Sequence, residues 1–153
     1  MNPFTFNAPK SIQFGVGALS RLGELVSGQI GTRVMLVTDP GMIATGIVDR
    51  ALSSLADAGV AVEVFKDVAA DPPEAIVLSA AAQARDAGVK GVVGLGGGSS
   101  LDVAKLVALL ASGTEDLKDA YGVGNAKGPR LPLILVPTTA GTGSEVTPIS
   151  IVT

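Results

Sequence analysis

The middle of the chain reads Val92-Val93-Gly94-Leu95-Gly96-Gly97-Gly98-Ser99-Ser100-Leu101-Asp102-Val103-Ala104-Lys105. An apolar run that breaks into glycines and then into a serine-led helical pattern is typical of a strand, a tight turn and the start of a helix. The first turn of a helix leaves backbone N–H groups unpaired at the positive end of the helix dipole, and glycines let an anion approach them closely. We interpret this stretch as a phosphate-binding turn.

Two well-known phosphate motifs do not fit this turn. The dinucleotide fingerprint G-x-G-x-x-G would place its third glycine where the chain has Ser99. The P-loop needs Gly-Lys followed by Ser or Thr, and the chain has no such sequence. A glycine-rich turn between a strand and a helix can also be purely structural, so the rest of the chain has to decide between the two interpretations.

The composition suits one domain with a well-buried core. The 153 residues are 47% apolar and 16% charged, which favours a sheet covered by helices on both faces. A net charge of −3 without a basic run argues against nucleic acid or a membrane surface as a partner. The absence of histidine and cysteine excludes imidazole bases, thiolates and disulfides from this chain. Because the N-terminus lacks the pattern of a signal peptide, we expect a cytoplasmic protein.

Apolar runs alternate with helical patterns along the chain. The expected strands cover residues 11–14, 33–38, 60–65, 91–95 and 131–136, and a further β-rich run covers residues 149–153. The expected helices cover residues 18–26, 43–58, 71–87 and 99–112, with a turn at 117–121. Alternation through short loops predicts an α/β fold in which a parallel sheet is flanked by helices on both faces.

Three polar loops follow expected strands. Ligands of parallel α/β sheets bind outside the carboxyl ends of the strands, where Asp39 and residues 96–99 and 137–144 would gather. Asp39 is placed to accept hydrogen bonds from a ribose diol. It is equally a good helix N-cap, because Pro40 and Gly41 follow it. The sequence leaves both interpretations open.

Two charged residues follow the glycine turn. Ser99 and Asp102 have the spacing of a Ser-x-x-Asp capping box, whereas a carboxylate beside a bound diphosphate would be repelled. Asp102 therefore either caps the helix or faces the nicotinamide end of a dinucleotide. Lys105 either pairs with Asp102 at i+3 or is a solvated helix charge.

A second polar motif reads Pro137-Thr138-Thr139-Ala140-Gly141-Thr142-Gly143-Ser144-Glu145-Val146-Thr147. It offers hydroxyls and backbone amides without a catalytic partner. The G-x-S-x-G nucleophile elbow is not present here, and no histidine exists to activate a serine. The motif is typical of a ligand clamp.

Together the two motifs resemble the N-terminal signatures of the iron-containing alcohol dehydrogenases, which are related to glycerol dehydrogenase and dehydroquinate synthase. The resemblance covers the whole chain but only the first part of such an enzyme. It implies that residues 1–153 form a Rossmann-like dinucleotide-binding domain, the N-terminal domain of a two-domain enzyme. The C-terminal helical domain, whose aspartate and three histidines hold Fe²⁺ or Zn²⁺, is absent from this sequence.

The resemblance also implies roles for individual residues. Asp39 would bind the adenosine ribose, and Gly97, Gly98 and Ser99 would bind the diphosphate. The ribose and nicotinamide side would be bound by Asp102, Thr138, Thr139, Thr142 and Thr147. Because a carboxylate at position 39 repels the 2′-phosphate of NADP, we expect NAD to be preferred. No catalytic residue and no metal ligand is assigned to this chain.

The resulting hypothesis is the NAD(P)-binding part of a metal-dependent alcohol dehydrogenase that moves a hydride between an alcohol or aldehyde substrate and nicotinamide. The expected assembly is a homo-oligomer, and this chain is expected to be inactive by itself for lack of metal ligands. The alternatives are a relative of glycerol dehydrogenase or dehydroquinate synthase, or a stand-alone nucleotide-binding module.

Overall fold

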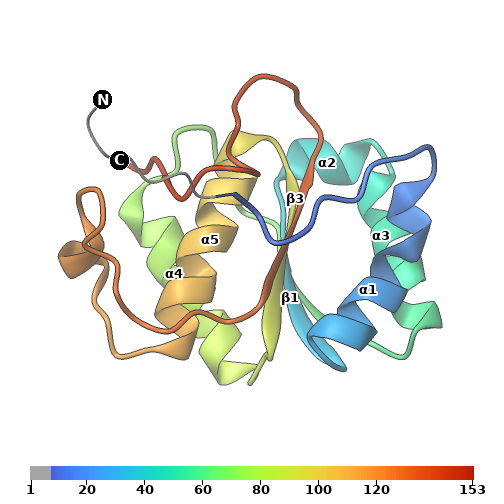
Figure 1. The fold of residues 1–153 in the computed structure, drawn as a ribbon, viewed down its shortest axis with the longest axis horizontal. Helices are drawn as coiled ribbons and strands as arrows, with labels where there is room; N and C mark the ends of the chain where they lie inside the picture. The colour runs from blue at the N-terminus through green and yellow to red at the C-terminus, as the bar shows by residue number, and fades with distance from the viewer. Residues whose placement is uncertain (1–7) are drawn as a thin grey trace, which may run out of the picture.

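The structure is a computed structural model, which describes residues 8–153. The described residues form a four-stranded parallel sheet in the order β2-β1-β3-β4 (Figure 1). The strands are β1 (Arg33–Val37), β2 (Ala61–Phe65), β3 (Gly91–Gly96) and β4 (Leu133–Pro137). The expected α/β class and parallel sheet are therefore confirmed.

Helices cover both faces of the sheet. In Figure 1, α4 and α5 lie on one side and α1, α2 and α3 on the other. The helical elements are η1 (Ala18–Arg21), α1 (Leu22–Gln29), α2 (Pro40–Ala44), α3 (Ile47–Asp57), α4 (Glu74–Asp86), α5 (Gly98–Ser112) and η2 (Leu117–Ala120). None of the helices in residues 8–153 is long and apolar enough to cross a membrane.

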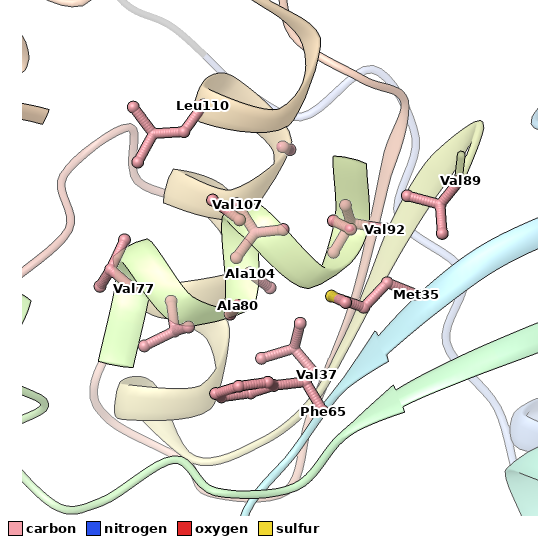
Figure 2. Packing of buried hydrophobic residues seen from close by; sticks show 14 of the residues in the cluster. Met35, Val37, Phe65, Val77, Ala80, Val89, Val92, Ala104, Val107 and Leu110 are labelled. Carbon is pink, nitrogen blue, oxygen red and sulfur yellow. The ribbon is translucent and has the colours of Figure 1, made fainter. Parts of the chain in front are cut away.

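Each face of the sheet has its own apolar core. Figure 2 shows the core under α4 and α5, where Met35, Val37 and Phe65 of the sheet face side chains such as Val77 and Val107 of the helices. On the other face, α1 and α3 cover a second core that includes Val34, Leu36, Val93 and Leu95 of the sheet. The central strands alternate between the two cores, which explains why β1 and β3 read as nearly continuous apolar runs.

Glycines in the helices and strands allow close contacts between elements. A Cβ atom at Gly94 of β3 would lie 2.7 Å from the Cβ atom of Ala104, so α5 packs directly on the strand backbone. A Cβ atom at Gly23 of α1 would lie 1.9 Å from the carbonyl oxygen of Ser54 in α3. These positions set the distance between neighbouring elements.

Some expectations about the elements were wrong. Residues 11–14 form no strand: Ile12 and Phe14 are exposed, and no other described strand lies beside them. Residues 149–153 form no strand either, because the backbone of Thr153 bonds to Pro72, in the loop before α4, and to Glu74, the first residue of α4. β propensity forms a strand only where a partner strand exists.

Other errors concern helix boundaries. The helix expected from residue 71 begins at Glu74. The helix expected over residues 18–26 is the 3-10 helix η1 followed by α1, which continues to Gln29. The expected helix 43–58 is two helices, because Gly46 lies in the left-handed region at φ 76° between α2 and α3. The helix expected from Ser99 begins one residue earlier, at Gly98, and Gly97 is its N-cap.

Candidate functional site

The carboxyl ends of β1, β3 and β4 bring the three polar loops together. The amide of Thr138, just after β4, donates to the carbonyl of Gly96 at the end of β3, with an N–O distance of 2.9 Å. In Figure 1 the red segment after β4 arches over the edge of the sheet where α5 begins. The helix after β1 and the helix after β3 belong to opposite faces, and ligands of open α/β sheets bind at such a point.

The glycine turn needs its glycines for different reasons. Gly96 has φ 151°, and a Cβ atom there would lie 2.7 Å from the hydroxyl of Ser100 and 3.0 Å from Oδ2 of Asp39. The first hydrogen bond in α5 runs from the amide of Leu101 to the carbonyl of Gly97, at 3.1 Å. The amides of residues 98–100 precede that bond and have no carbonyl one turn back within the helix. They form the donor set that an anion binds at a helix N-terminus.

The start of α5 faces the loop after β4 across the glycines. A Cβ atom at Gly97 would lie 3.6 Å from the side chain of Thr139. At Gly98 it would lie 3.2 Å from Oγ of Ser144 and 3.4 Å from Cβ of Thr142. Any side chain at these two positions would fill the space between the helix and the loop. The residues present therefore fit a diphosphate held by amides and hydroxyls.

Asp39 caps α2, as one of its two interpretations predicts. Its Oδ1 accepts from the amide of Met42 at 3.1 Å. Its Oδ2 accepts from the hydroxyl of Ser100 at 3.0 Å, which joins the loop after β1 to the first turn of α5. Sequence reasoning missed Ser100, whose partner is 61 positions away in the chain. Asp39 is half-buried beside the glycine turn, and its interaction with a ribose remains a prediction.

The capping box of Ser99 and Asp102 is wrong, because the helix begins at Gly98 and no side chain caps it. Asp102 is instead buried and pairs with Lys105, with 2.8 Å between Oδ1 and Nζ. The expected i+3 pair is therefore confirmed. The interpretation of Lys105 as a solvated charge is wrong, because only 5% of the residue is exposed.

The threonines of the second motif lie along one arch. Thr138 is half-buried and its hydroxyl oxygen has no hydrogen-bond partner among the described residues. Thr139 and Thr142 are exposed beside Gly97 and Gly98 respectively. Thr147 is exposed farther along the arch, where its amide donates to the carbonyl of Gly143 at 3.1 Å. The structure thus brings Thr138, Thr139 and Thr142 to the glycine turn, while Thr147 lies farther from it in the chain.

A metal site does not fit the described residues. The chain has no histidine or cysteine, and no group of three possible ligands gathers within residues 8–153. A separate cavity of about 440 Å³ lies beside α5 and is lined in part by Leu109, Tyr121 and Ile149.

The chain belongs to the iron-containing alcohol dehydrogenase family, whose model matches residues 9–153. It is 38% identical over 153 residues to the choline dehydrogenase of Bacillus subtilis, an alignment that covers 97% of this chain and 38% of the relative. The chain therefore spans well under half the length of this relative.

Solved structures of the family share the fold. The NADH-dependent butanol dehydrogenase A of Thermotoga maritima superposes with a TM-score of 0.89 at 31% identity, over 100% of this chain and 39% of that structure. The sulfoacetaldehyde reductase of Bifidobacterium kashiwanohense, solved in complex with NAD⁺, superposes with a TM-score of 0.84 at 31% identity, over 100% of this chain and 40% of that structure. The fold matches the N-terminal domain of iron-containing alcohol dehydrogenases.

Proposed function

We propose that this chain is the NAD-binding part of an iron-type alcohol dehydrogenase that transfers a hydride between a small alcohol or aldehyde and nicotinamide. The observation that carries the proposal is the glycine turn at the start of α5, which faces the loop after β4. Because Gly97 and Gly98 have no side chains, space is left between the turn and this loop. Membership in the family and the NAD⁺ complex of a relative support the same ligand.

In this proposal the residues of the chain bind and orient the cofactor. The amides of Gly98 and Ser99 donate to the diphosphate, while Gly97 gives it room beside the backbone. Asp39 accepts from the adenosine ribose through the lone pairs that Met42 and Ser100 leave free. Asp102 and the hydroxyls of Thr138, Thr139, Thr142 and Thr147 serve the ribose and nicotinamide side.

The bound cofactor supplies the hydride acceptor, and the chain supplies orientation and electrostatics. We infer that the domain spans residues 1–153, and that Fe²⁺ or Zn²⁺ is held by residues outside this chain, because the residues present do not form such a site. We also propose a cytoplasmic homo-oligomer. NAD is proposed over NADP because of the carboxylate of Asp39.

The proposal is tested by titrating NADH into the natural protein and into its Gly98→Val variant, with calorimetry as the measure of affinity. A valine side chain would fill the space between α5 and Ser144 and keep the diphosphate from the amides. Loss of one hydrogen bond to a charged group costs about 1.5–3 kcal/mol. Because each ~1.4 kcal/mol is tenfold in affinity, NADH should bind about tenfold more weakly or worse.

Gly28→Val is the matched control. Gly28 is an exposed glycine of α1, and a Cβ atom there would have nothing within 4 Å. NADH should bind this variant as it binds the natural protein. Equal affinities of the Gly98 and Gly28 variants would contradict the proposed site, and a natural protein that does not bind NADH would contradict the proposed function.

A further inference from the structure

The ammonium group of Lys105 is buried among acceptors that no catalytic or cofactor role explains. Its Nζ donates to the carbonyl oxygen of Ser144 at 3.0 Å, to that of Thr147 at 3.3 Å, and to that of Ile149. It also pairs with Oδ1 of Asp102 at 2.8 Å. We call Lys105, Asp102 and these three carbonyl groups the Lys105 cluster.

The cluster attaches one irregular segment to a helix. Residues 144–151 belong to no helix or strand, so their backbone lacks the regular bonds that fix such elements. Three of their carbonyls meet at one nitrogen of α5. The amide of Ile151 donates to Oδ2 of Asp102 at 3.0 Å, which adds a fourth attachment.

The same helix holds the glycine turn. Gly98 is the first residue of α5, and Lys105 follows it by seven positions, or about two helical turns. Segment 144–151 continues the loop whose Thr142 and Ser144 lie against Gly98, and it carries Thr147. The start of the arch, at Thr138, is bonded to Gly96 of β3, and α5 fixes the part of the arch from Thr142 onward relative to the amides at its own N-terminus.

We propose that Lys105 is a positioning residue: by binding the carbonyls of Ser144, Thr147 and Ile149, it holds the nicotinamide side of the cofactor site in place. The inference rests on the proposed function. In this proposal Lys105 acts through the backbone of the segment that bears Thr147 and makes no contact with the cofactor itself. A lysine suits this task because an ammonium group has three donors and no acceptor, so several carbonyls can share it.

If Lys105 only stabilised the fold, its replacement would have a different effect. Buried ion pairs are weak evidence of stability, since apolar replacements of both partners are often tolerated. Lys105→Met would leave the buried carboxylate of Asp102 without its counter-charge and can unfold the protein, so that variant by itself would be ambiguous. In Asp102→Asn the ammonium group keeps its three carbonyl acceptors. The informative comparison is Asp102→Asn against Asp102→Asn combined with Lys105→Met. Neither variant has a buried carboxylate at position 102, both keep an oxygen that can accept from Ile151, and they differ only in the lysine.

Two measurements on the natural protein and both variants separate the possibilities. Amide hydrogen exchange reports whether segment 144–151 is held. Titrations with NADH and with AMP compare the whole cofactor with its adenosine end. NADH binding can be followed by the fluorescence of NADH, because the chain has no tryptophan that would interfere.

The double variant should differ from Asp102→Asn in two ways. Exchange should rise within residues 144–151 and stay unchanged in β1, β3 and α4. NADH should bind about tenfold more weakly, while AMP affinity should stay within about twofold, because Asp39 and Gly97 are held by other contacts. Equal exchange in segment 144–151 would overturn the proposal. Equal NADH affinity, or equal losses for NADH and AMP, would overturn it as well. A natural protein that binds no NADH would contradict the proposed function, and the exchange data would still show whether Lys105 holds the segment.

Discussion

At the scale of single residues, Asp39 takes the helix-capping role, one of the two that the sequence left open. It caps α2 through Met42, and its second oxygen binds Ser100 next to the glycine turn. The cap follows from local sequence, since an aspartate before Pro-Gly is a strong helix start. The contact with Ser100 does not, because it joins residues 61 positions apart.

Replacement of Asp39 should change the preference between cofactors. Asp39→Gly removes both the acceptor for the 2′-hydroxyl of NAD and the repulsion of the 2′-phosphate of NADP. Like charges brought together in a partly desolvated site cost several kcal/mol, so the ratio of NAD to NADP affinity should fall about tenfold or more. Calorimetric titration of both cofactors measures the ratio.

Asp39→Asn separates the cap from the charge in the same experiment. Asparagine is as good an N-cap as aspartate, but it carries no charge. The affinity of the Asp39→Asn variant for NADP should therefore rise, and α2 should remain folded. An unchanged ratio in both variants would mean that Asp39 is a cap and nothing more.

At the scale of elements, the sequence indicated the helices and strands better than their contacts. The buried strands β1 and β3 were predictable because two apolar faces leave a continuous apolar run. Helix ends marked by Gly59 and Gly88 were equally clear, as both glycines lie in the left-handed region. The Lys105 cluster could not be predicted, because its carbonyls lie 39 to 44 positions away and backbone acceptors leave no mark in a sequence.

The contact between α1 and α3 should depend on Gly23. A Cβ atom at this position would overlap the backbone of Ser54, so Gly23→Ala must push the two helices apart. Overpacking of this kind costs about 1–3 kcal/mol, and urea unfolding should show a loss of that size. Gly28→Ala, in the same helix with nothing within 4 Å, should be neutral or stabilising by about 0.5–1 kcal/mol. Similar stabilities of the two variants would contradict the packing described here.

The loop after η2 should loosen in acid. The amides of Lys127 and Gly128 donate to the carboxylate of Glu115 at 3.0 and 2.8 Å, and these two bonds hold its pKa below the ordinary value of 4.5. A lowered pKa means that the fold favours the charged form. Glu115 therefore supports the loop at pH values above its ordinary pKa, and this support is lost as the pH falls through the lowered pKa of Glu115 in the folded protein.

Hydrogen exchange at Lys127 and Gly128 measures this change directly. After correction for the intrinsic rate, their protection should fall as the pH drops below 4.5. In Glu115→Gln, which has no titrating carboxylate at this position, protection should be lower at neutral pH and vary little with acid. Equal pH dependence in the natural protein and the variant would show that Glu115 does not hold the loop.

At the scale of the whole molecule, the order of the strands places the site. β1 and β3 are neighbours in the middle of the sheet, and the helices that follow them cover opposite faces. The loops after these strands therefore meet at one edge, and β4 adds its arch of hydroxyls beside them. The parallel sheet was predictable from alternating elements, and with it the edge at which the polar loops gather. The order of the strands was not predictable, because the local sequence does not indicate which strands pair with each other.

We propose that this edge of the sheet binds the diphosphate of NAD, and an NMR titration of the natural protein with NADH provides the test. The amides of Gly97, Gly98 and Ser99 should show the largest chemical-shift changes, followed by those of Thr138 and Thr139, because the donors at the start of α5 meet the anion first. The same amides should move less with AMP, which lacks the diphosphate. Largest shifts at Tyr121 and Val123, in the cavity on the other part of α5, would contradict the claim, as would the absence of shifts at the glycine turn with saturating NADH.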